Sequence, residues 1–352
     1  MTKKLSILYF TIIYCISVFS QAGTGVYQFL DLPVSSRLSA LGSYNVSLRD
    51  NDVNFSFCNP ALLTSETNNT LGLNMAIYLA DIKFGSAIYG KTFAKNNYFA
   101  AGIQYIDYGL FKEATELNVL TGQTFTAKDM ALNLMYARPI TSQITIGGTF
   151  KIINSVYEQY NSYGIAVDAG ISYNDSARFF SAGLVFRNMG TQLKGYYSDE
   201  GGQHIESLPF NIQLGLSKKL AYAPLRFSLT LQNLQQWDLN YQTTNQPIDN
   251  LASKTISTKT TVKPIEFVDM AFRHMVIAVE FVPSKNFYLA AAYNDRRQQE
   301  MTMTGFKSMS GFSFGGGIKL YKFHVGFGTT QFQTGNSSYQ FSITTSLNEF
   351  RL

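Results

Sequence analysis

From Thr70 to the C-terminus, apolar and polar residues alternate with a period of two. In the last of these segments, one face carries Tyr339, Phe341, Ile343, Thr345 and Leu347, and the other carries Gln340, Ser342, Thr344 and Ser346. Successive side chains of a β-strand point to opposite faces, so such a segment has one apolar and one polar side. A chain of such segments is expected to enclose a polar interior within an apolar surround.

About fourteen such segments follow one another. They start near residues 70, 83, 98, 128, 144, 162, 179, 209, 225, 273, 287, 311, 323 and 339. The pattern predicts an all-β fold, a transmembrane antiparallel β-barrel of about 14 strands spanning residues 70–352. A soluble β-sandwich is the alternative, but it does not need Tyr and Phe near both ends of so many strands.

The composition excludes several other classes of protein. Only 14% of the 352 residues are charged, whereas an ordinary soluble domain carries about 25%. After the first twenty positions no apolar run reaches about 18 residues, which excludes a helical membrane bundle. The 22 Tyr and 28 Phe exclude a disordered chain. The net charge of +5 is too small to suggest nucleic acid as a partner.

The connections between segments differ in length. Most are short, but four are long and are predicted to be extracellular loops: 109–127, 190–208, 234–272 and 297–310. Outer-membrane barrels have short periplasmic turns and long extracellular loops. The connections therefore favour the barrel independently of the alternation.

The N-terminus has the pattern of a secretory signal peptide over residues 1–20, with Gln21 as the expected mature start. Cys15 would be acylated in a lipoprotein, but Tyr14 is too bulky for that cleavage site. Cys58 is then the only cysteine left. It either pairs between molecules or is a small buried hydrophobe.

Residues 21–69 do not alternate and are predicted to form an N-terminal hatch in or below the lumen. Ser35 or Ser36 is suited to cap a short helical turn that ends at Gly42, and Asn59-Pro60 is suited to start another. Irregular backbone at membrane depth is tolerated only where protein or water surrounds it. The segment is therefore expected to plug the barrel or to lie at its periplasmic mouth.

The alternation also places charged residues on the inner face of the strands. They are Lys151, Asp168, Arg187, Arg226, Glu280 and Lys319. One interpretation is a path for a ligand or ion. The other is an ion-pair network that grips the hatch, because a charge on the lipid face costs about 2–4 kcal/mol.

Residues suited to catalysis or metal binding do not form a recognisable pattern. Gly311–Gly315 matches Gly-x-Ser-x-Gly, but that chemistry requires a strand–turn–helix context, and here the Ser lies in mid-strand. His204, His274, His324 and Cys58 lack metal-ligand spacing. We therefore expect no enzyme activity, no metal and no cofactor.

The run Phe29–Gly42, followed by Asn59-Pro60-Ala61, resembles the PorV/PorQ family of the type IX secretion system, and its opening looks most like PorQ-type members. That family is similar to FadL-like barrels, which have fourteen strands and an N-terminal hatch. The resemblance makes Arg37, Gly42, Asn59, Pro60 and Ala61 hatch residues. They serve either gating or structure alone, with Arg37 pairing with a lumen carboxylate and Asn59 capping a turn.

The resemblance also implies a location and partners. It implies the outer membrane of a Gram-negative, Bacteroidetes-like bacterium and a non-enzymatic role in the attachment complex, which links cargo carrying C-terminal signals to the cell surface. Implied partners are a PorZ-like soluble surface protein, a PorU-like sortase, a PorV-like barrel, and outer-membrane lipid or lipopolysaccharide. The expected contact residues are Trp237, Tyr241 and Phe267 in the longest loop; alternatively, that loop is a lid over the mouth.

Two other functions remain open from the sequence. One is a FadL-like transporter of a hydrophobic solute, in which Gly147-Gly148 and Gly315–Gly317 bend strands around a lateral opening. The other is a PorV-like cargo shuttle. One departure concerns the C-terminus, where Phe350 lies two residues before the end although barrel assembly signals often end on the aromatic residue.

Overall fold

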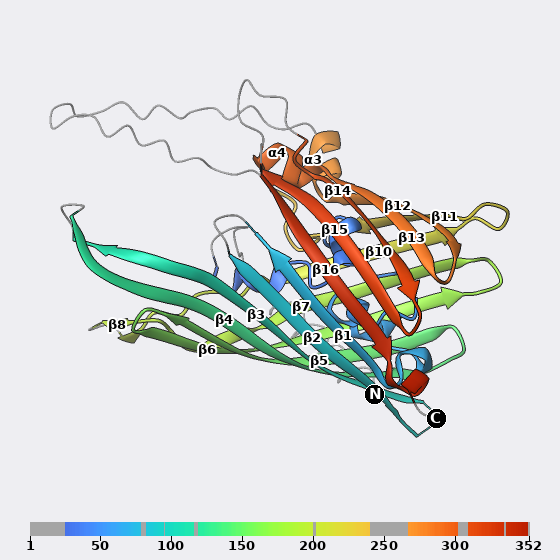
Figure 1. Ribbon diagram of the computed structural model, residues 1–352, viewed down its shortest axis with the longest axis horizontal. Coiled ribbons are helices and arrows are strands. Elements are labelled where there is room, and N and C mark those ends of the chain that lie inside the picture. Colours follow the sequence, from blue (N-terminus) through green and yellow to red (C-terminus); the bar gives the residue numbers. More distant parts are fainter. Residues whose placement is uncertain are drawn as a thin grey trace, which may run out of the picture.

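A computed structural model describes residues 25–78, 82–94, 96–115, 119–199, 202–239, 267–301, 309–333 and 336–350. Within these residues, fourteen antiparallel strands close into a barrel (Figure 1), which confirms the predicted fold class. The strands are β1 (Thr70–Ile77), β2 (Lys83–Phe93), β3 (Asn97–Ala114), β4 (Leu120–Pro139), β5 (Ile144–Tyr157), β6 (Tyr160–Asp175), β7 (Phe180–Lys194), β10 (Asn211–Lys219), β11 (Leu225–Leu231), β12 (Met275–Ser284), β13 (Phe287–Asn294), β14 (Phe312–Leu320), β15 (Phe323–Gln333) and β16 (Asn336–Ser346).

The alternating residues point as the sequence predicts. On β16, Tyr339, Phe341 and Ile343 are exposed on the outer surface, whereas Gln340 and Ser342 are buried inside. β1 pairs with β16 in register and closes the barrel. The outer surface is thus a belt of apolar side chains, the surface that lipid tails solvate. None of the described helices is long and apolar enough to cross a membrane.

The barrel wall is uneven in height. Strands β3–β7, here called the tall wall, have 14 to 20 residues each, whereas β10–β16, the low wall, have 7 to 11. Figure 1 shows β3 and β4 extending farther than their neighbours. The expectation that 109–127 is a long loop was therefore wrong. Phe111 of β3 stacks on Phe125 of β4 at 5.3 Å, and the two strands stay paired past a bulge.

The other long connectors contain regular structure in their described parts. After β7 ends at Lys194, β8 (Ser198–Asp199) and β9 (Gly202–Gln203) form a small separate sheet. Helices α3 (Phe267–Arg273) and α4 (Asp295–Met301) pack against each other at the same end of the barrel (Figure 1). We call this end the long-connector end, and the opposite end, with turns such as 285–286, the short-turn end. The rest of 234–272 and of 297–310 lies outside the described residues.

Residues 25–69, the hatch, run through the lumen from one end of the barrel to the other. The Val26 N–H donates to Ser207 O (3.1 Å) at the long-connector end, and Leu347 N–H donates to Asn69 O (2.7 Å) at the short-turn end. Its elements are η1 (Gln28–Asp31), α2 (Ser36–Ala40), η2 (Val53–Phe57), η3 (Pro60–Leu62) and η4 (Ser65–Thr67); a further short helix, η6 (Leu347–Phe350), follows β16. Most hatch residues are buried. The hatch is the core of the barrel.

The predicted turn starts of the hatch are confirmed. Ser35 Oγ accepts a hydrogen bond from Leu38 N–H at the start of α2, and Gly42 follows the helix with a φ of +83°. Asn59 Oδ1 accepts from Ala61 N–H (3.0 Å) at the start of η3. Each cap satisfies a backbone donor that a short helix leaves unpaired.

Two wall glycines allow the hatch to lie directly against the barrel. A Cβ on Gly147 would lie 2.7 Å from the backbone N of Ala61, and one on Gly315 would lie 2.7 Å from Cβ of Ala40. Only glycine permits such an approach. These positions were considered as bends at a lateral opening, but the structure places the hatch against them.

Candidate functional site at the junction of hatch and wall

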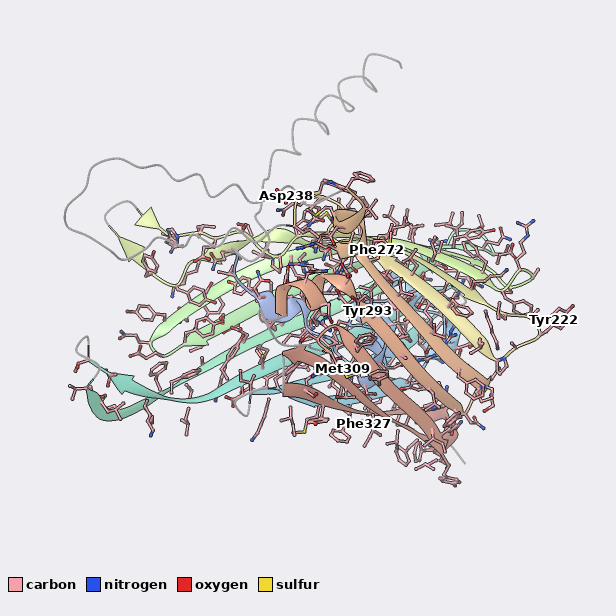
Figure 2. All side chains as sticks on the ribbon, turned by 90° about the horizontal axis from the view of Figure 1, so that it is seen from above. Tyr222, Asp238, Phe272, Tyr293, Met309 and Phe327 are labelled. Carbon is pink, nitrogen blue, oxygen red and sulfur yellow. The ribbon has the colours of Figure 1, made fainter. Side chains whose placement is uncertain are left out.

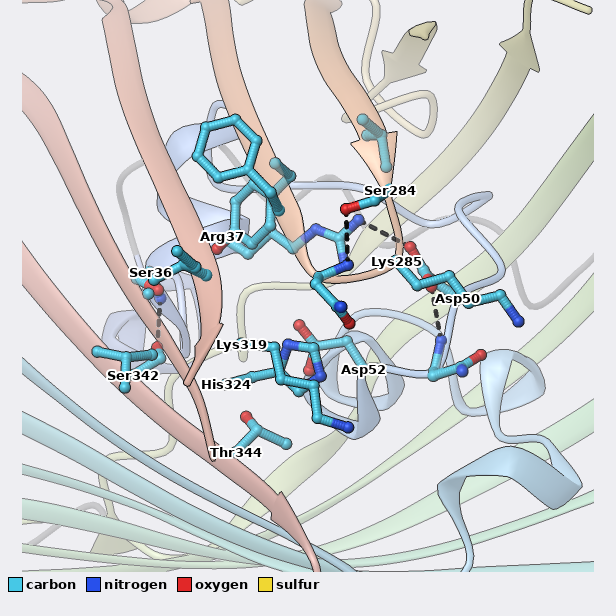
Figure 3. Close-up of a pocket in the computed structure, with 18 of the residues that line it drawn as sticks. Ser36, Arg37, Asp50, Asp52, Ser284, Lys285, Lys319, His324, Ser342 and Thr344 are labelled. Carbon is cyan, nitrogen blue, oxygen red and sulfur yellow. Dashed lines mark hydrogen bonds and ion pairs between the residues drawn. The ribbon is translucent and has the colours of Figure 1, made fainter. Parts of the chain in front are cut away.

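Four side chains of alternating charge form a closed ring where the hatch meets the low wall. Arg37 Nη2 lies 2.8 Å from Asp50 Oδ2, and Arg37 Nε lies 3.1 Å from Glu280 Oε1. Arg226 lies 3.3 Å from Asp50 and 2.6 Å from Glu280. Figure 3 shows the Arg37–Asp50 side of this ring. Each charge thus has two partners of the opposite sign.

The local fold positions each member of the ring. Arg226 on β11 and Glu280 on β12 are register partners, so their side chains leave the wall side by side. Arg37 extends from α2, and its guanidinium lies 4.6 Å from the centre of the Tyr288 ring. Asp50 belongs to the irregular part of the hatch. The wall supplies one acid and one base, and the hatch supplies the matching pair.

The ring is buried, so each of its charges depends on its oppositely charged partners. The Glu280 side chain is only 2% exposed, and a buried charge is tolerated when it is paired and hydrogen-bonded. Burial alone raises the pKa of the Asp50 carboxyl, but the charges of Arg37 and Arg226 outweigh it and hold this pKa well below its usual range. By contrast, burial raises the pKa of nearby Asp52.

A cavity of about 540 Å³ opens beside the ring at the short-turn end (Figure 3). Its lining includes Arg37, Asp50, Asp52, Lys285, Lys319 and His324. A second cavity of about 480 Å³ shares Asp50, Lys219 and Arg226 with it. Apolar residues such as Val282, Phe287 and Ile318 also line the first cavity, so this vestibule is bounded by the hatch and the low wall and has a mixed lining.

A second group of ion pairs lies at the tall wall, and one of them, Arg187–Asp31, reaches the hatch. Lys151 Nζ lies 2.8 Å from Asp168 Oδ2 and donates to Asn188 Oδ1 at 2.7 Å. Arg187 donates to Leu30 O at 3.0 Å and lies 3.6 Å from the Asp31 carboxylate. Burial raises the pKa of the Asp31 carboxyl, and the positive charge of Arg187 offsets this increase only in part. This contact is looser than the charge ring.

The six predicted lumen charges divide into two sets. Lys151, Asp168, Arg187, Arg226 and Glu280 lie inside the barrel and are all paired as described. Lys319, near the end of β14, also faces the lumen cavity that Arg37 and Asp52 line, and its ammonium pairs with Glu349 at the short-turn end (2.8 Å).

The predicted hatch motif also has defined contacts. Asn59 Nδ2 donates to Val46 O (2.8 Å) and Ile171 O (3.3 Å), so this side chain joins two parts of the hatch to β6. Pro60 and Ala61 lie against Gly147, and Gly42 lies against Val276 of β12. Cys58 is buried and is not in a disulfide.

The predicted contact residues come together at the long-connector end. The Trp237 ring stacks on Phe267 (4.9 Å) and on His274 (5.2 Å). Trp237 is 51% exposed and Phe267 is 72% exposed. Tyr241 lies outside the described residues. In Figure 2 neighbouring Phe272 and Asp238 lie far from Tyr222, which marks the short-turn end.

Some members of the site were not anticipated. Asp50 and Tyr288 complete the surroundings of Arg37, and Asn188 joins the Lys151 pair. The polar run Arg49–Asp52 in an otherwise apolar hatch was a signal for Asp50. Ser313 of the Gly-x-Ser-x-Gly match is buried and bonds to Thr330 Oγ1 (3.1 Å). Within the described ranges, no cluster of three or more His, Cys, Asp or Glu side chains is suited to hold a metal ion.

Several solved structures have a fold similar to that of this chain. The toluene transporter TodX of Pseudomonas putida aligns with 90% of this chain and 99% of its own, with a TM-score of 0.52 and 11% sequence identity. The toluene transporter TbuX of Ralstonia pickettii aligns with 90% of this chain and 97% of its own (TM-score 0.50, 11% identity). For the monoaromatic hydrocarbon channel CymD these values are 89%, 97%, 0.50 and 12%. The chain thus has the fold of these toluene transporters and of this hydrocarbon channel.

The likeness is one of fold, because the sequence identities are very low. No family model matches the sequence. No curated protein matches it either. These likenesses therefore show the fold of this barrel and not its function.

Proposed function

We propose that this protein is an outer-membrane barrel of a Gram-negative bacterium that admits a small hydrophobic solute and catalyses no reaction. The observation that carries this proposal is the fold, which matches the toluene transporters TodX and TbuX over nearly the whole chain. This transport role, the alternative raised by the sequence, has better support from the comparisons than attachment does.

The hatch determines how such a solute would pass. It fills the lumen, because most of its residues are buried between the walls. Passage therefore requires the hatch to move or the solute to leave sideways. The ring of Arg37, Asp50, Arg226 and Glu280 is the contact that a moving hatch has to break.

Uptake of radiolabelled toluene tests this proposal. Cells that lack the protein are compared with the parent cells and with cells in which the wild-type chain is restored to the parental amount in the outer membrane. We expect uptake to fall to the background rate without the barrel and to be restored by the wild-type chain. Equal uptake with and without the barrel would reject toluene transport by this barrel.

A second candidate function is the anchoring of a soluble surface protein, as the resemblance to the PorV/PorQ family implies. Two observations favour it. Ion pairs join the hatch to both walls, Arg37–Glu280 at the low wall and Asp31–Arg187 at the tall wall, which suits a barrel that stays closed. Trp237 and Phe267 form an exposed stacked pair at the long-connector end, and such aromatic residues commonly anchor interfaces.

In this second role the partner is a PorZ-like surface subunit of a type IX secretion system, with a PorU-like sortase and a PorV-like barrel in the same complex. A tagged pull-down from native outer membranes, analysed by mass spectrometry, separates the roles. A soluble surface protein in near-equal amount supports anchoring, and signal-bearing cargo supports the shuttle role. Recovery of the barrel alone rejects both and leaves transport.

A further inference from the structure

Four tyrosines surround an open hollow at the long-connector end. The hollow has a volume of about 340 Å³ and is bounded by Tyr157, Tyr160, Tyr196 and Tyr197. Small-molecule pockets commonly measure about 300–1,000 Å³. The hollow is separate from the charge ring and from both cavities at the short-turn end.

The rings of this hollow are held in place from behind. Tyr157 and Tyr196 stack at 5.0 Å with an interplanar angle of 12°. Tyr157 and Tyr108 donate their hydroxyl protons to Asp129 Oδ2 at 2.9 and 2.7 Å. The Tyr196 hydroxyl lies 2.6 Å from Ser155 Oγ, which in turn bonds to Asp129. These contacts fix Tyr157 and Tyr196, and the more exposed rings of Tyr160 and Tyr197 form the accessible side of the hollow.

The hollow faces water and not the lipid tails. Tyr157 continues the inward series of β5, in which Ile153 and Ser155 are fully buried. Because alternate residues share a face, Tyr157 points to the inside of the tall wall. Tyr160 and Tyr197 are 44% and 52% exposed. The ring faces are thus apolar surfaces above the hatch that open to the cell exterior.

We propose that this hollow binds a sugar ring of a cell-surface glycan. A pyranose presents a face of C–H groups that packs on an aromatic ring, while its hydroxyls remain hydrated. Tyrosine suits this mixed chemistry because it combines an apolar body with a polar tip. His204 stacks on the outer ring Tyr197 at 5.3 Å. Because the hollow is open, the bound molecule keeps one side in water, which suits a sugar ring better than a hydrocarbon.

Titration of saccharides onto the purified full-length barrel, in a detergent without sugar headgroups, tests this site. The probes are the lipid-free polysaccharide of lipopolysaccharide and the free polysaccharide that the same cells release; the stronger one identifies the source. Saturation-transfer NMR reports contact with the protein. We expect binding to weaken about tenfold when the exposed rings are removed in a Tyr160→Ala/Tyr197→Ala variant.

The control variant is Tyr222→Ala, which removes a fully exposed tyrosine at the opposite end and should bind as the wild type does. Heat-modifiable migration on gels verifies that each variant forms a barrel. Unchanged sugar binding in the double variant, or no binding of either polysaccharide to the wild type, overturns the proposal. Toluene binding that is lost in the double variant would instead assign the hollow to a hydrophobic solute. This site stands or falls separately from solute uptake.

Discussion

Arg37 in the hatch and Glu280 in the wall are 243 residues apart, yet the Arg37 Nε donates to Glu280 Oε1 at 3.1 Å. Glu280 also accepts from Arg226 Nε at 2.7 Å. One buried carboxylate therefore neutralises an arginine of the plug and an arginine of the barrel. This shared acid couples the position of the hatch to the integrity of the low wall.

Replacing Glu280 with Gln should destabilise the protein strongly, because two buried guanidinium groups lose a counter-charge. Breaking a buried pair typically costs about 3–5 kcal/mol. Urea titration, followed by the loss of heat-modifiable migration, measures the change. Glu349→Gln is the matched control, because its pair with Lys319 is partly exposed and should contribute below about 1 kcal/mol. Equal effects of both variants would contradict a special role for the ring.

Acid should remove the stabilisation that the Asp50 carboxyl provides, but not the stabilisation that the Asp31 carboxyl provides. The pKa of Asp50 lies below its usual value of 3.8, so the stabilisation it provides is complete above that value and is lost as the pH falls towards the lowered pKa. The pKa of Asp31 is raised by burial, so its stabilising effect is present at low pH and is lost as the pH rises through the raised pKa.

Two neutral variants separate these effects. At pH 7 we expect Asp50→Asn to lower the melting temperature clearly and Asp31→Asn to change it little or to raise it. The difference between Asp50→Asn and wild type should shrink in acid. Melting curves from pH 2 to pH 8 on the detergent-solubilised barrel measure this. A constant difference across that range would argue against the coupling.

Enlarging Gly147 should displace the hatch. A Val side chain there would collide with Pro60 and Ala61, whereas the neighbouring Gly148 has no such contact with the hatch. We expect Gly147→Val to make cells more sensitive to large antibiotics that intact outer membranes exclude, and Gly148→Val to leave sensitivity unchanged. Antibiotic sensitivity and single-channel conductance report on the opening. A sealed Gly147→Val barrel would show that the hatch tolerates the shift.

The lone tryptophan provides a direct sensor for a surface partner. Trp237 is half exposed and stacked between Phe267 and His274. If a soluble protein docks on this pair, the Trp237 emission should shift to shorter wavelength, and Trp237→Ala should reduce partner recovery in the pull-down. Tyr222→Ala, at the opposite end, should retain the partner fully. Undiminished recovery with Trp237→Ala would exclude this pair as the contact.

Much of the barrel could be predicted from local patterns. The strands that begin at Thr70, Lys83, Leu225, Phe287 and Phe323 start at the expected residues, because alternation identifies a strand without reference to its neighbours. The lengths of β3 and β4 could not be predicted in this way. Their outer parts are held by cross-strand contacts such as Phe111–Phe125, which a single-strand pattern does not contain.

The site was less accessible to sequence reasoning. The alternation predicts that Arg226 and Glu280 point into the barrel, and the sequence also predicts that Arg37 pairs with a carboxylate in the lumen. The identity of that carboxylate depends on the path of the hatch through the lumen. The hatch is irregular, so no sequence periodicity predicts this path. The tyrosine hollow could not be predicted, because Tyr196 and Tyr197 follow the end of β7 at Lys194, and the alternation of a single strand does not show that they lie beside Tyr157 of β5.

The threading of the hatch has a consequence for how the molecule is made. Helix α2 precedes every barrel strand in the chain, yet it bonds to Thr330 and Ser342 on the last two strands. The last strand, β16, also forms the seam with β1. Because the final strands supply these contacts, the hatch cannot complete its packing until those strands are in place. The sheet must therefore assemble around the hatch, and the pairing of β1 with β16 completes both the barrel and the packing of the hatch.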